Sequence, residues 1–339
     1  MADSLFYRLI DGTATVVEKS CTNIGSYAFY NCSALTTASF PSCTTIGSNA
    51  FQYCTALTTA SFPSCTTIGS NAFCSCSALT TASFPSCTTI NAGAFQYCAA
   101  LTTVSFPNCT TIGSSAFQYC RALTTASFPS CTTIGSSAFQ YCSVLTTASF
   151  PNCIYINSYA FQYCSALATA SFPNCTLMLS NAFCSCFALT TAFFPNCTYI
   201  NSCAFSNCSA LTTASFPSCG TIGSNAFQSC RALTTAIFSH QKPEQGIVSA
   251  SAFQKCYNLL SLYLLASTVY RLSNINAFTS TPISTYTTST GGVYGSIYVP
   301  SSLLTTYKNS TNWITYTARF VGLTDTEIAR VMASGTHLA

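Results

Sequence analysis

Cysteine is the residue type in this sequence with the widest range of possible chemistry, and its spacing is regular. There are 24 cysteines, and most of them fall into two columns with a period of 22 residues. The first column has eleven members, from Cys32 to Cys256, and the second has ten, from Cys21 to Cys219; the remaining three are Cys74, Cys184 and Cys203. Because thiolates bind zinc, attack electrophiles and form disulfides, each of these activities is a candidate role for the two columns.

Disulfides and metal binding are both poor explanations of the two columns. Vertical neighbours about 4.8 Å apart suit a disulfide in distance, but parallel side chains in register rarely give the torsion near 90°. Zinc needs four converging ligands, and no histidine lies near the pairs Cys74/Cys76 and Cys184/Cys186. We therefore expect no metal and no cofactor, and interpret the columns as buried free thiols. Their members include Cys43, Cys65, Cys87, Cys54, Cys76 and Cys98.

Acid–base catalysis has no candidate residues within the repeats. No aspartate, glutamate or histidine occurs between Cys21 and Phe238. His240 and His337 are isolated, and the interpretation as surface histidines outweighs a catalytic one. We therefore predict that the chain is not an enzyme.

The distribution of charge argues against nucleic acid as a partner. Charged residues make up 5% of the chain, and between Ser20 and Gln241 they are limited to Arg121 and Arg231. A net charge of +4 near the ends gives no basic stripe, so nucleic acid is not expected as a partner.

Residues 1–20 contain no secretory signal and no apolar run reaches transmembrane length, so we expect no membrane insertion. We expect an extracellular, cell-surface or virion-associated protein that leaves the cell by another route.

The strands and turns that position the cysteines are predicted from a single sequence repeat. A phenylalanine recurs ten times in phase from Phe29 to Phe227, and alanine precedes it every time. This periodicity predicts a solenoid, in which stacked repeats bury a continuous core and no single repeat folds alone. Phe51, Phe73 and Phe95 belong to this column and are expected to form part of the core.

Each repeat divides into two extended segments and a turn. In residues 35–40, threonine and serine alternate with alanine and phenylalanine, which predicts a strand with the apolar side chains inward. Pro41 ends the strand because proline lacks the N–H that pairing requires. Residues 43–46 predict a second, shorter extended face, and the apolar spacing in residues 48–54 predicts one helical turn over the core.

The repeat pattern also divides the chain into segments. We expect an N-terminal cap at 1–20, ten 22-residue repeats at 21–240, irregular longer repeats at 241–280, a C-terminal capping module at 281–322 and a tail at 323–339. In the capping module we predict a strand at 297–300, a short helix at 301–307 and an anchoring role for Trp313. A capping-box pattern at residues 324–327 predicts a last helix in the tail.

The columns L-x-x-A-x-F-P and C-T-T-I-G-S-x-A-F-Q-Y-C resemble BspA-type, treponemal-style leucine-rich repeats, which are marked by I-G-x-x-A-F-x-x-C. The resemblance covers roughly residues 21–280, with alanine and phenylalanine at two usual leucine positions of the strand. It implies a leucine-rich-repeat solenoid with a parallel sheet on one face and caps at both ends. It also implies a non-enzymatic bacterial or prophage surface protein for adhesion or recognition, without identifying a ligand.

Large apolar residues interrupt the outward threonine and serine columns, or lie near them, in three consecutive repeats. Those in the columns are Ile154, Tyr155, Leu177 and Tyr199, and those nearby are Tyr159, Phe187 and Phe193. Tyr155, Leu177 and Tyr199 share one column, so stacking would form a ridge about 10 Å tall. Such residues are typical of a contact with a partner or another subunit, and drift in degenerate repeats is an equal alternative.

Three functions follow from these patterns. The leading prediction is a non-catalytic recognition or adhesion scaffold that binds a protein or glycan on a host or neighbouring cell through the solenoid face. The alternative is self-association into a fibre or virion component, because a nearly neutral surface does little to keep copies apart. A weaker alternative is ice binding by the regular threonine columns, and the interruptions at Phe193 and Ile237 count against it.

Overall fold

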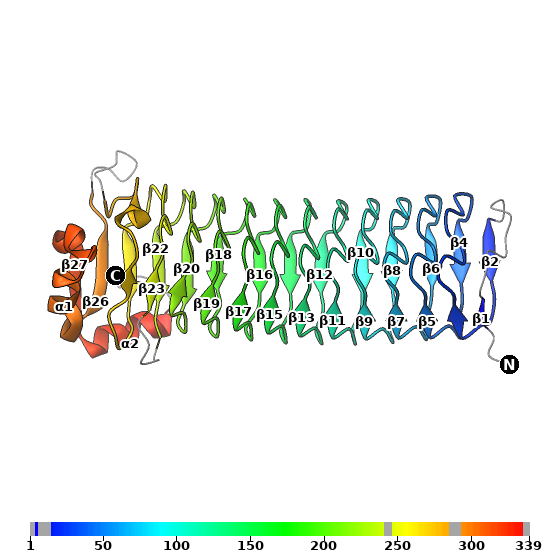
Figure 1. The fold of residues 1–339 in the computed structure, drawn as a ribbon, viewed down its shortest axis with the longest axis horizontal. Coiled ribbons are helices and arrows are strands. Elements are labelled where there is room, and N and C mark those ends of the chain that lie inside the picture. Colours follow the sequence, from blue (N-terminus) through cyan, green and yellow to red (C-terminus); the bar gives the residue numbers. More distant parts are fainter. Residues whose placement is uncertain (1–3, 6–14, 241–245, 285–292, 335–339) are drawn as a thin grey trace. The chain divides into compact units, whose positions relative to one another are not determined.

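The computed structural model describes residues 4–5, 15–240, 246–284 and 293–334. The chain divides into two compact units, Met1–Phe172 and Pro173–Ala339. In each unit successive repeats lie side by side as the turns of a parallel β-solenoid (Figure 1). The predicted repeat solenoid is therefore confirmed.

The first unit contains two series of parallel strands, one on each of two faces. The longer strands form a five-stranded sheet of β2 (Val16–Glu18), β4 (Thr37–Ser39), β6 (Thr59–Ser61), β8 (Thr81–Ser83) and β10 (Thr103–Ser105), and a three-stranded sheet of β12 (Thr125–Ser127), β14 (Thr147–Ser149) and β16 (Thr169–Ser171). The shorter strands are β1 (Ser4–Leu5), β3 (Asn23–Ile24), β5 (Thr45–Ile46), β7 (Thr67–Ile68), β9 (Thr89–Ile90), β11 (Thr111–Ile112), β13 (Thr133–Ile134) and β15 (Tyr155–Ile156).

The second unit continues the same pattern and adds the helices. Its six-stranded sheet consists of β18 (Thr191–Phe193), β20 (Thr213–Phe216), β22 (Thr235–Phe238), β24 (Ser261–Leu264), β26 (Ser296–Pro300) and β27 (Phe320–Leu323). Its shorter strands are β17 (Leu177–Met178), β19 (Tyr199–Ile200), β21 (Thr221–Ile222), β23 (Ile247–Val248) and β25 (Arg271–Leu272). The helices are η1 (Ile275–Phe278), η3 (Ser301–Leu303), α1 (Leu304–Asn309), η4 (Trp313–Arg319) and α2 (Asp325–Ser334).

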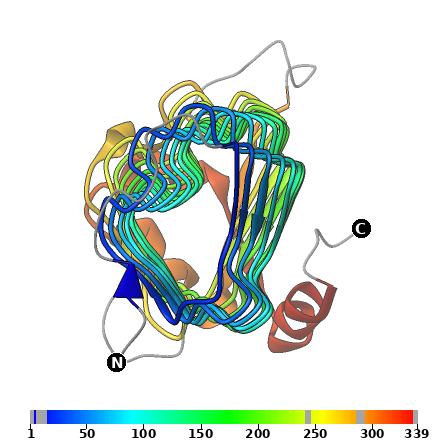
Figure 2. The ribbon, with the colours of Figure 1, turned by 90° about the vertical axis from the view of Figure 1, so that its right-hand side faces the viewer.

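Alternation along the longer strands separates the core from the surface, as the sequence predicts. In β4, Ala38 is buried while Thr37 and Ser39 are partly exposed, and Phe40 beyond the strand is buried. In the shorter strands the isoleucine is buried and the residue before it faces outward. Seen along the array, the two series of strands occupy different sides of each turn, with the core between them (Figure 2).

Two phenylalanine columns fill this core and interlock. The rings of Phe51 and Phe73 are parallel, with centroids 5.1 Å apart, and both are fully buried. Phe62 of the second column meets them edge-on, with its centroid 5.7 Å from Phe51 and 5.8 Å from Phe73. Offset-stacked and edge-to-face contacts are the favourable arrangements for aromatic rings, and here they repeat in each turn.

The expected helical turn at residues 48–54 is instead a run of tight turns. The N–H of Ala50 donates to the carbonyl three residues back, on Gly47, but the N–H of Phe51 donates to Ala72 of the next repeat. Because alternate N–H groups bond between repeats, the i to i−4 ladder of a helix cannot form. Asn49 and Tyr53 take the left-handed conformation, with φ of 59° and 64°.

Threonine hydroxyls also connect successive repeats. The Oγ1 of Thr44 donates to the carbonyl of Thr22 at 3.1 Å, and Thr66 donates to Thr44 at 3.1 Å. The hydroxyls of this column therefore stabilise the stacking of the turns, which gives them a structural task independent of any ligand.

The C-terminal elements agree with the sequence predictions. The strand expected at 297–300 is part of β26, and the helix expected at 301–307 corresponds to η3 and α1. The Trp313 side chain is fully buried and its Nε1–H donates to the carbonyl of Tyr270 at 2.6 Å. The predicted capping box is present at α2, where the Thr324 N–H donates to the Glu327 carboxylate at 2.8 Å.

Helix α2 covers the outer face of the six-stranded sheet near its C-terminal strands (Figure 2). Its Val331 is fully buried against Ile237 and Tyr263, which lie in register in the outward column of β22 and β24. Ile237 therefore interrupts the outward serine column because α2 packs on it.

Replacing Phe117 by alanine tests the phenylalanine columns. The Phe117 ring is fully buried, and its centroid lies 5.3 Å from that of Phe95 and 5.2 Å from that of Phe139. We expect Phe117→Ala to lower the free energy of unfolding by about 3–5 kcal/mol, because it leaves a cavity that stacked repeats cannot close. Urea denaturation followed by circular dichroism measures this change.

The control is Thr125→Ser, which alters an exposed residue of β12 and is expected to change stability by less than about 0.5 kcal/mol. A loss below about 1 kcal/mol for Phe117→Ala would contradict the importance of the columns.

Candidate functional site

The structure places both cysteine columns in the core. All cysteines are buried except Cys203, which is partly exposed. The thiols donate to backbone carbonyls, as Cys54 does to Phe29 at 3.1 Å and Cys43 to Thr45 at 3.3 Å. Each column thus has the environment of a small buried side chain with one weak hydrogen bond.

Burial makes these thiols unreactive at neutral pH. Burial, with a smaller contribution from the neighbouring thiol in the column, raises the pKa of Cys43 from 9.0 to about 11 and that of Cys54 to about 12. Since the thiolate is the form that attacks electrophiles and binds metals, these groups are poor nucleophiles and poor ligands. Among the residues that the structure describes, no group of three or more histidine, cysteine or acidic side chains is placed to hold a metal ion.

The prediction that His240 is a surface residue is wrong. Its side chain is only 3% exposed and lies edge-on to the ring of Tyr270, with centroids 5.0 Å apart. Gly246 leaves room for both rings, because a Cβ there would lie 2.7 Å from His240 Nε2 and closer still to the Tyr270 ring. Neither packing partner is apparent from the local sequence. His337 and the interior of the loop after His240 lie outside the described residues.

Three of the residues proposed for partner binding lie in the first unit, and all are exposed. Tyr155 is in β15, in register with Thr133, and is 48% exposed. Ile154 precedes it and is 37% exposed. Tyr159 lies in the following turn in the left-handed conformation, with φ of 63°. At β15, apolar side chains thus occupy the outward positions that threonine occupies in the preceding repeat.

The other four proposed residues lie in the second unit on different faces. Leu177 and Tyr199 are paired in register in β17 and β19, with Leu177 half-buried and Tyr199 exposed. Phe187 is exposed in a turn, whereas Phe193 is exposed on the outer face of β18. The structure therefore separates Phe193 from Tyr199, because the five residues 194–198 carry the chain from one series of strands to the other.

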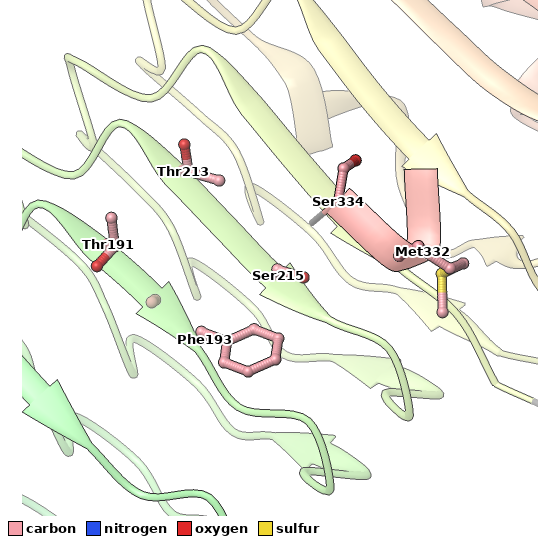
Figure 3. A pocket seen from close by; sticks show the side chains of 8 residues that line it. Thr191, Phe193, Thr213, Ser215, Met332 and Ser334 are labelled. Atoms are coloured by element: carbon pink, nitrogen blue, oxygen red, sulfur yellow. The ribbon is translucent and has the colours of Figure 1, made fainter. Parts of the chain in front are cut away.

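Phe193 contributes to an open pocket of about 420 Å³ at the end of α2 (Figure 3). The strands β18 and β20 supply Thr191, Thr213 and Ser215 together with Phe193, and Met332 and Ser334 come from α2. Figure 3 shows the Phe193 ring next to Ser215 and on the same side of the sheet as the helix. The pocket is a mixed apolar and hydroxyl surface without a charged group among its lining residues.

Sequence reasoning assigned no role to a further surface feature of the first unit. We use the name tyrosine ladder for Tyr97, Tyr119, Tyr141 and Tyr163. Their rings stack in sequence with centroids 4.9, 4.6 and 4.8 Å apart and planes within 10° of parallel. Tyr97 and Tyr163, at the two ends, are 46% and 37% exposed. The signal in the sequence is the unbroken run of A-F-Q-Y-C in four repeats.

The fold does not require tyrosine at this position of the turn. All four residues of the tyrosine ladder have φ between 60° and 63°, a left-handed conformation that is unfavourable for a bulky side chain. Ser75 and Asn207 occupy the same position of other repeats with φ of 62°. Small polar residues therefore adopt the same backbone conformation at this position, so the turn itself does not require an aromatic side chain.

The residue before each tyrosine of the tyrosine ladder is a glutamine, and these glutamines form a row of their own. The side-chain amide of Gln96 donates to that of Gln118, Gln118 donates to Gln140, and Gln140 donates to Gln162 at 2.5 Å. These partly buried amide bonds hold consecutive turns in register, so the tyrosine rings are presented at a fixed spacing.

One cation lies beside the tyrosine ladder. The guanidinium carbon of Arg121 is 5.6 Å from the centroid of the Tyr119 ring, within the range of a cation–π interaction. Arg121 is the only charged residue between Ser20 and Phe172. The pKa of the Tyr141 hydroxyl is raised by partial desolvation and by its neighbours Tyr119 and Tyr163. The tyrosine ladder is thus an uncharged aromatic surface with a single positive group.

A thiol titration tests the environment of the cysteines. We expect native protein at pH 8 to react rapidly with Ellman's reagent at about one thiol, Cys203, since the rest are buried and protonated. In guanidinium chloride all 24 thiols should react. Fewer reactive thiols after unfolding would reveal disulfides, and several rapid thiols in the native protein would contradict the burial.

The raised thiol pKa values predict a loss of stability in alkali. The unfolded chain loses thiol protons near pH 9, whereas Cys43 and Cys54 keep theirs up to about pH 11 and 12. Because the unfolded state then binds fewer protons than the native state, the free energy of unfolding falls as pH rises from 9 to about 12. Urea denaturation at pH 8.0, 9.5 and 10.5 measures this. A constant free energy of unfolding over that range would show that the thiols titrate equally in both states.

Comparison with known proteins gives a family match over most of the chain. Residues 1–124, 88–198 and 176–293 match the model of the BspA type leucine-rich repeat region, which comprises six repeat copies. A search of curated proteins finds no match. Within the described residues, no helix combines the length and apolar character needed to cross a membrane.

Solved structures of bacterial leucine-rich repeat proteins are similar to the chain. A leucine-rich cell surface protein of Faecalibacterium prausnitzii A2-165 is 24% identical, with 75% of this chain and 79% of that chain covered and a TM-score of 0.41. A leucine-rich repeat protein of T. pallidum is 25% identical, covering 50% and 72% with a TM-score of 0.36. One from Bacteroides ovatus is 20% identical, covering 89% and 88% with a TM-score of 0.40.

The family model extends over residues 1–293, and the structure shows the parallel, in-register repeats that the motif requires. The chain belongs to the BspA-type leucine-rich repeat family.

Proposed function

We propose that this protein is a non-catalytic recognition scaffold that binds a protein or glycan partner through exposed aromatic and aliphatic side chains of its solenoid faces. The observation that supports this most directly is the exposure of large apolar residues where neighbouring repeats have threonine or serine. Tyr155 is 48% exposed and Phe193 is 57% exposed, each on a surface almost without charge. Exposed aromatic groups of this kind supply much of the binding energy in protein interfaces.

Each unit offers its own set of contact residues. The first unit presents Ile154, Tyr155 and Tyr159 next to a regular threonine surface. The second unit presents Leu177 and Tyr199 on the shorter strands, with Phe187 in a turn and Phe193 on the longer strands. Phe193 lines an open pocket and Tyr155 is exposed on a strand face, so the positions of each unit suit an extended partner surface better than a small substrate.

The chemistry of the repeats also supports a binding role. Burial raises the pKa of the thiols, and the repeats between Cys21 and Phe238 contain no acidic residue and no histidine. A rigid array with regular turns and little reactive chemistry fits a surface that recognises a partner by shape and apolar contact. The location we propose is a cell surface or a virion, facing a host or neighbouring cell.

The test replaces two of the exposed tyrosines by the residue of the neighbouring repeats. Purified protein is applied to a printed array of animal glycans and to an array of animal secreted and membrane ectodomains. We expect a binder in one array, and we expect Tyr155→Thr or Tyr199→Thr to weaken its Kd at least about tenfold, since each removes an exposed aromatic contact. Surface plasmon resonance measures the Kd.

Thr133→Ser is the matched control, because Thr133 lies next to Tyr155 in the same column and keeps the hydroxyl surface. The two arrays distinguish a glycan from a protein partner. Unchanged affinity in a variant carrying both tyrosine replacements would show that these residues do not form the contact.

A further inference from the structure

The tyrosine ladder occupies a position that small residues fill in other repeats; its end rings, Tyr97 and Tyr163, are exposed and its two middle rings are partly exposed. Ser75 adopts the same left-handed conformation as Tyr97 one repeat earlier, with φ of 62° in both. The four rings therefore add an aromatic surface that the turn itself does not need. We propose that the tyrosine ladder is a homodimer interface, on which a second copy of this chain packs in the antiparallel direction.

The spacing of the rings favours a second copy over another kind of partner. The centroids are 4.6 to 4.9 Å apart, because each ring belongs to one repeat of the parallel array. A second copy presents the same spacing, so all four rings find a ring of the partner at once. Interfaces in which identical side chains stack at the strand spacing are dry and closely packed for this reason. A partner without this period would match one or two rings only.

The distribution of charge also favours a second copy and selects its direction. Arg121 is the only charged residue between Ser20 and Phe172, so two such surfaces repel each other very little. In a parallel arrangement in register, the two Arg121 side chains would meet. A two-fold axis between Tyr119 and Tyr141 instead places Arg121 opposite Ser143 of the second copy, and beside its Tyr141. The antiparallel dimer thus replaces a repulsion by a second cation–π contact.

The length of the tyrosine ladder limits the assembly to a closed, weak dimer. The column has serine at positions 75 and 185, on either side of the four tyrosines. A two-fold arrangement uses the same surface on both copies and leaves no second surface for growth. Four rings at the strand spacing form a row only roughly 14 Å long, so the tyrosine ladder offers much less area than the about 800 Å² per partner of a standard interface. We therefore expect dissociation in the micromolar range.

Sedimentation velocity of the full chain from about 1 to 100 µM tests the proposal. The wild type should shift from a monomer of 35.9 kDa to a dimer over this range. The variant carrying Tyr119→Ser and Tyr141→Ser should remain monomeric, with dimerisation weakened at least tenfold. Serine is the natural residue at this position in other repeats, so the variant is expected to fold, and its thermal unfolding by circular dichroism verifies this.

Tyr53→Ser is the matched control. Tyr53 belongs to the same column and is 41% exposed, but Ser75 separates it from the tyrosine ladder. We expect it to dimerise like the wild type. A wild type that stays monomeric at 100 µM, a double variant that dimerises normally, or growth into filaments would each overturn the proposal.

The direction of packing is tested by photochemical cross-linking of tyrosines in a mixture of ¹⁵N-labelled and unlabelled chains. Antiparallel packing should give cross-links between Tyr97 of one chain and Tyr163 of the other, which mass spectrometry identifies by the mixed isotopes. Cross-links between two Tyr97 residues would overturn the antiparallel arrangement. The replacement Arg121→Ser should weaken dimerisation severalfold if the cation–π contact forms, and a tighter dimer would contradict it.

Discussion

The structure depends on parallel pairing of repeats in register, which places each side chain directly beside the same residue of the next repeat. Thr111, for example, is paired with Thr89 on one side and Thr133 on the other. A residue type is acceptable in a column only if it tolerates its own kind at about 4.8 Å. Like charges at this distance repel, which explains why the array between Ser20 and Gln241 contains only two charged residues.

The same constraint selects side chains that pair with themselves or with the next backbone. Phenylalanine stacks on phenylalanine, glutamine amides donate and accept in a row, and threonine hydroxyls donate to the preceding carbonyl. Cysteine fits because it is small, apolar enough to be buried and able to donate weakly to a carbonyl. Its neighbours also suppress its chemistry, since a second thiolate beside the first would be a buried like charge. The many cysteines therefore reflect dense packing of the core.

Much of the fold was accessible from the sequence, because the period of 22 residues and the alternation within each repeat encode it directly. The inward alanine, the end of the strand before proline and the capping box at Thr324 are all local signals. The turn at residues 48–54 was not accessible, because its N–H partners lie one repeat away. The burial of His240 and the separation of Phe193 from Tyr199 also depend on contacts and directions that single repeats do not reveal. The recurrence of tyrosine was apparent in the sequence, but the stacking and exposure of the rings were not.

In-register pairing also makes the repeats nearly interchangeable. Each of the repeats around the tyrosine ladder bonds to its two neighbours through the same groups at the same positions. An in-frame gain or loss of one unit by recombination between the near-identical coding segments would join equivalent edges and preserve the hydrogen bonds on both sides. Such an event would lengthen or shorten the row of tyrosines by one ring without a new fold having to evolve. The surface that meets other molecules can therefore change in discrete steps of a single repeat.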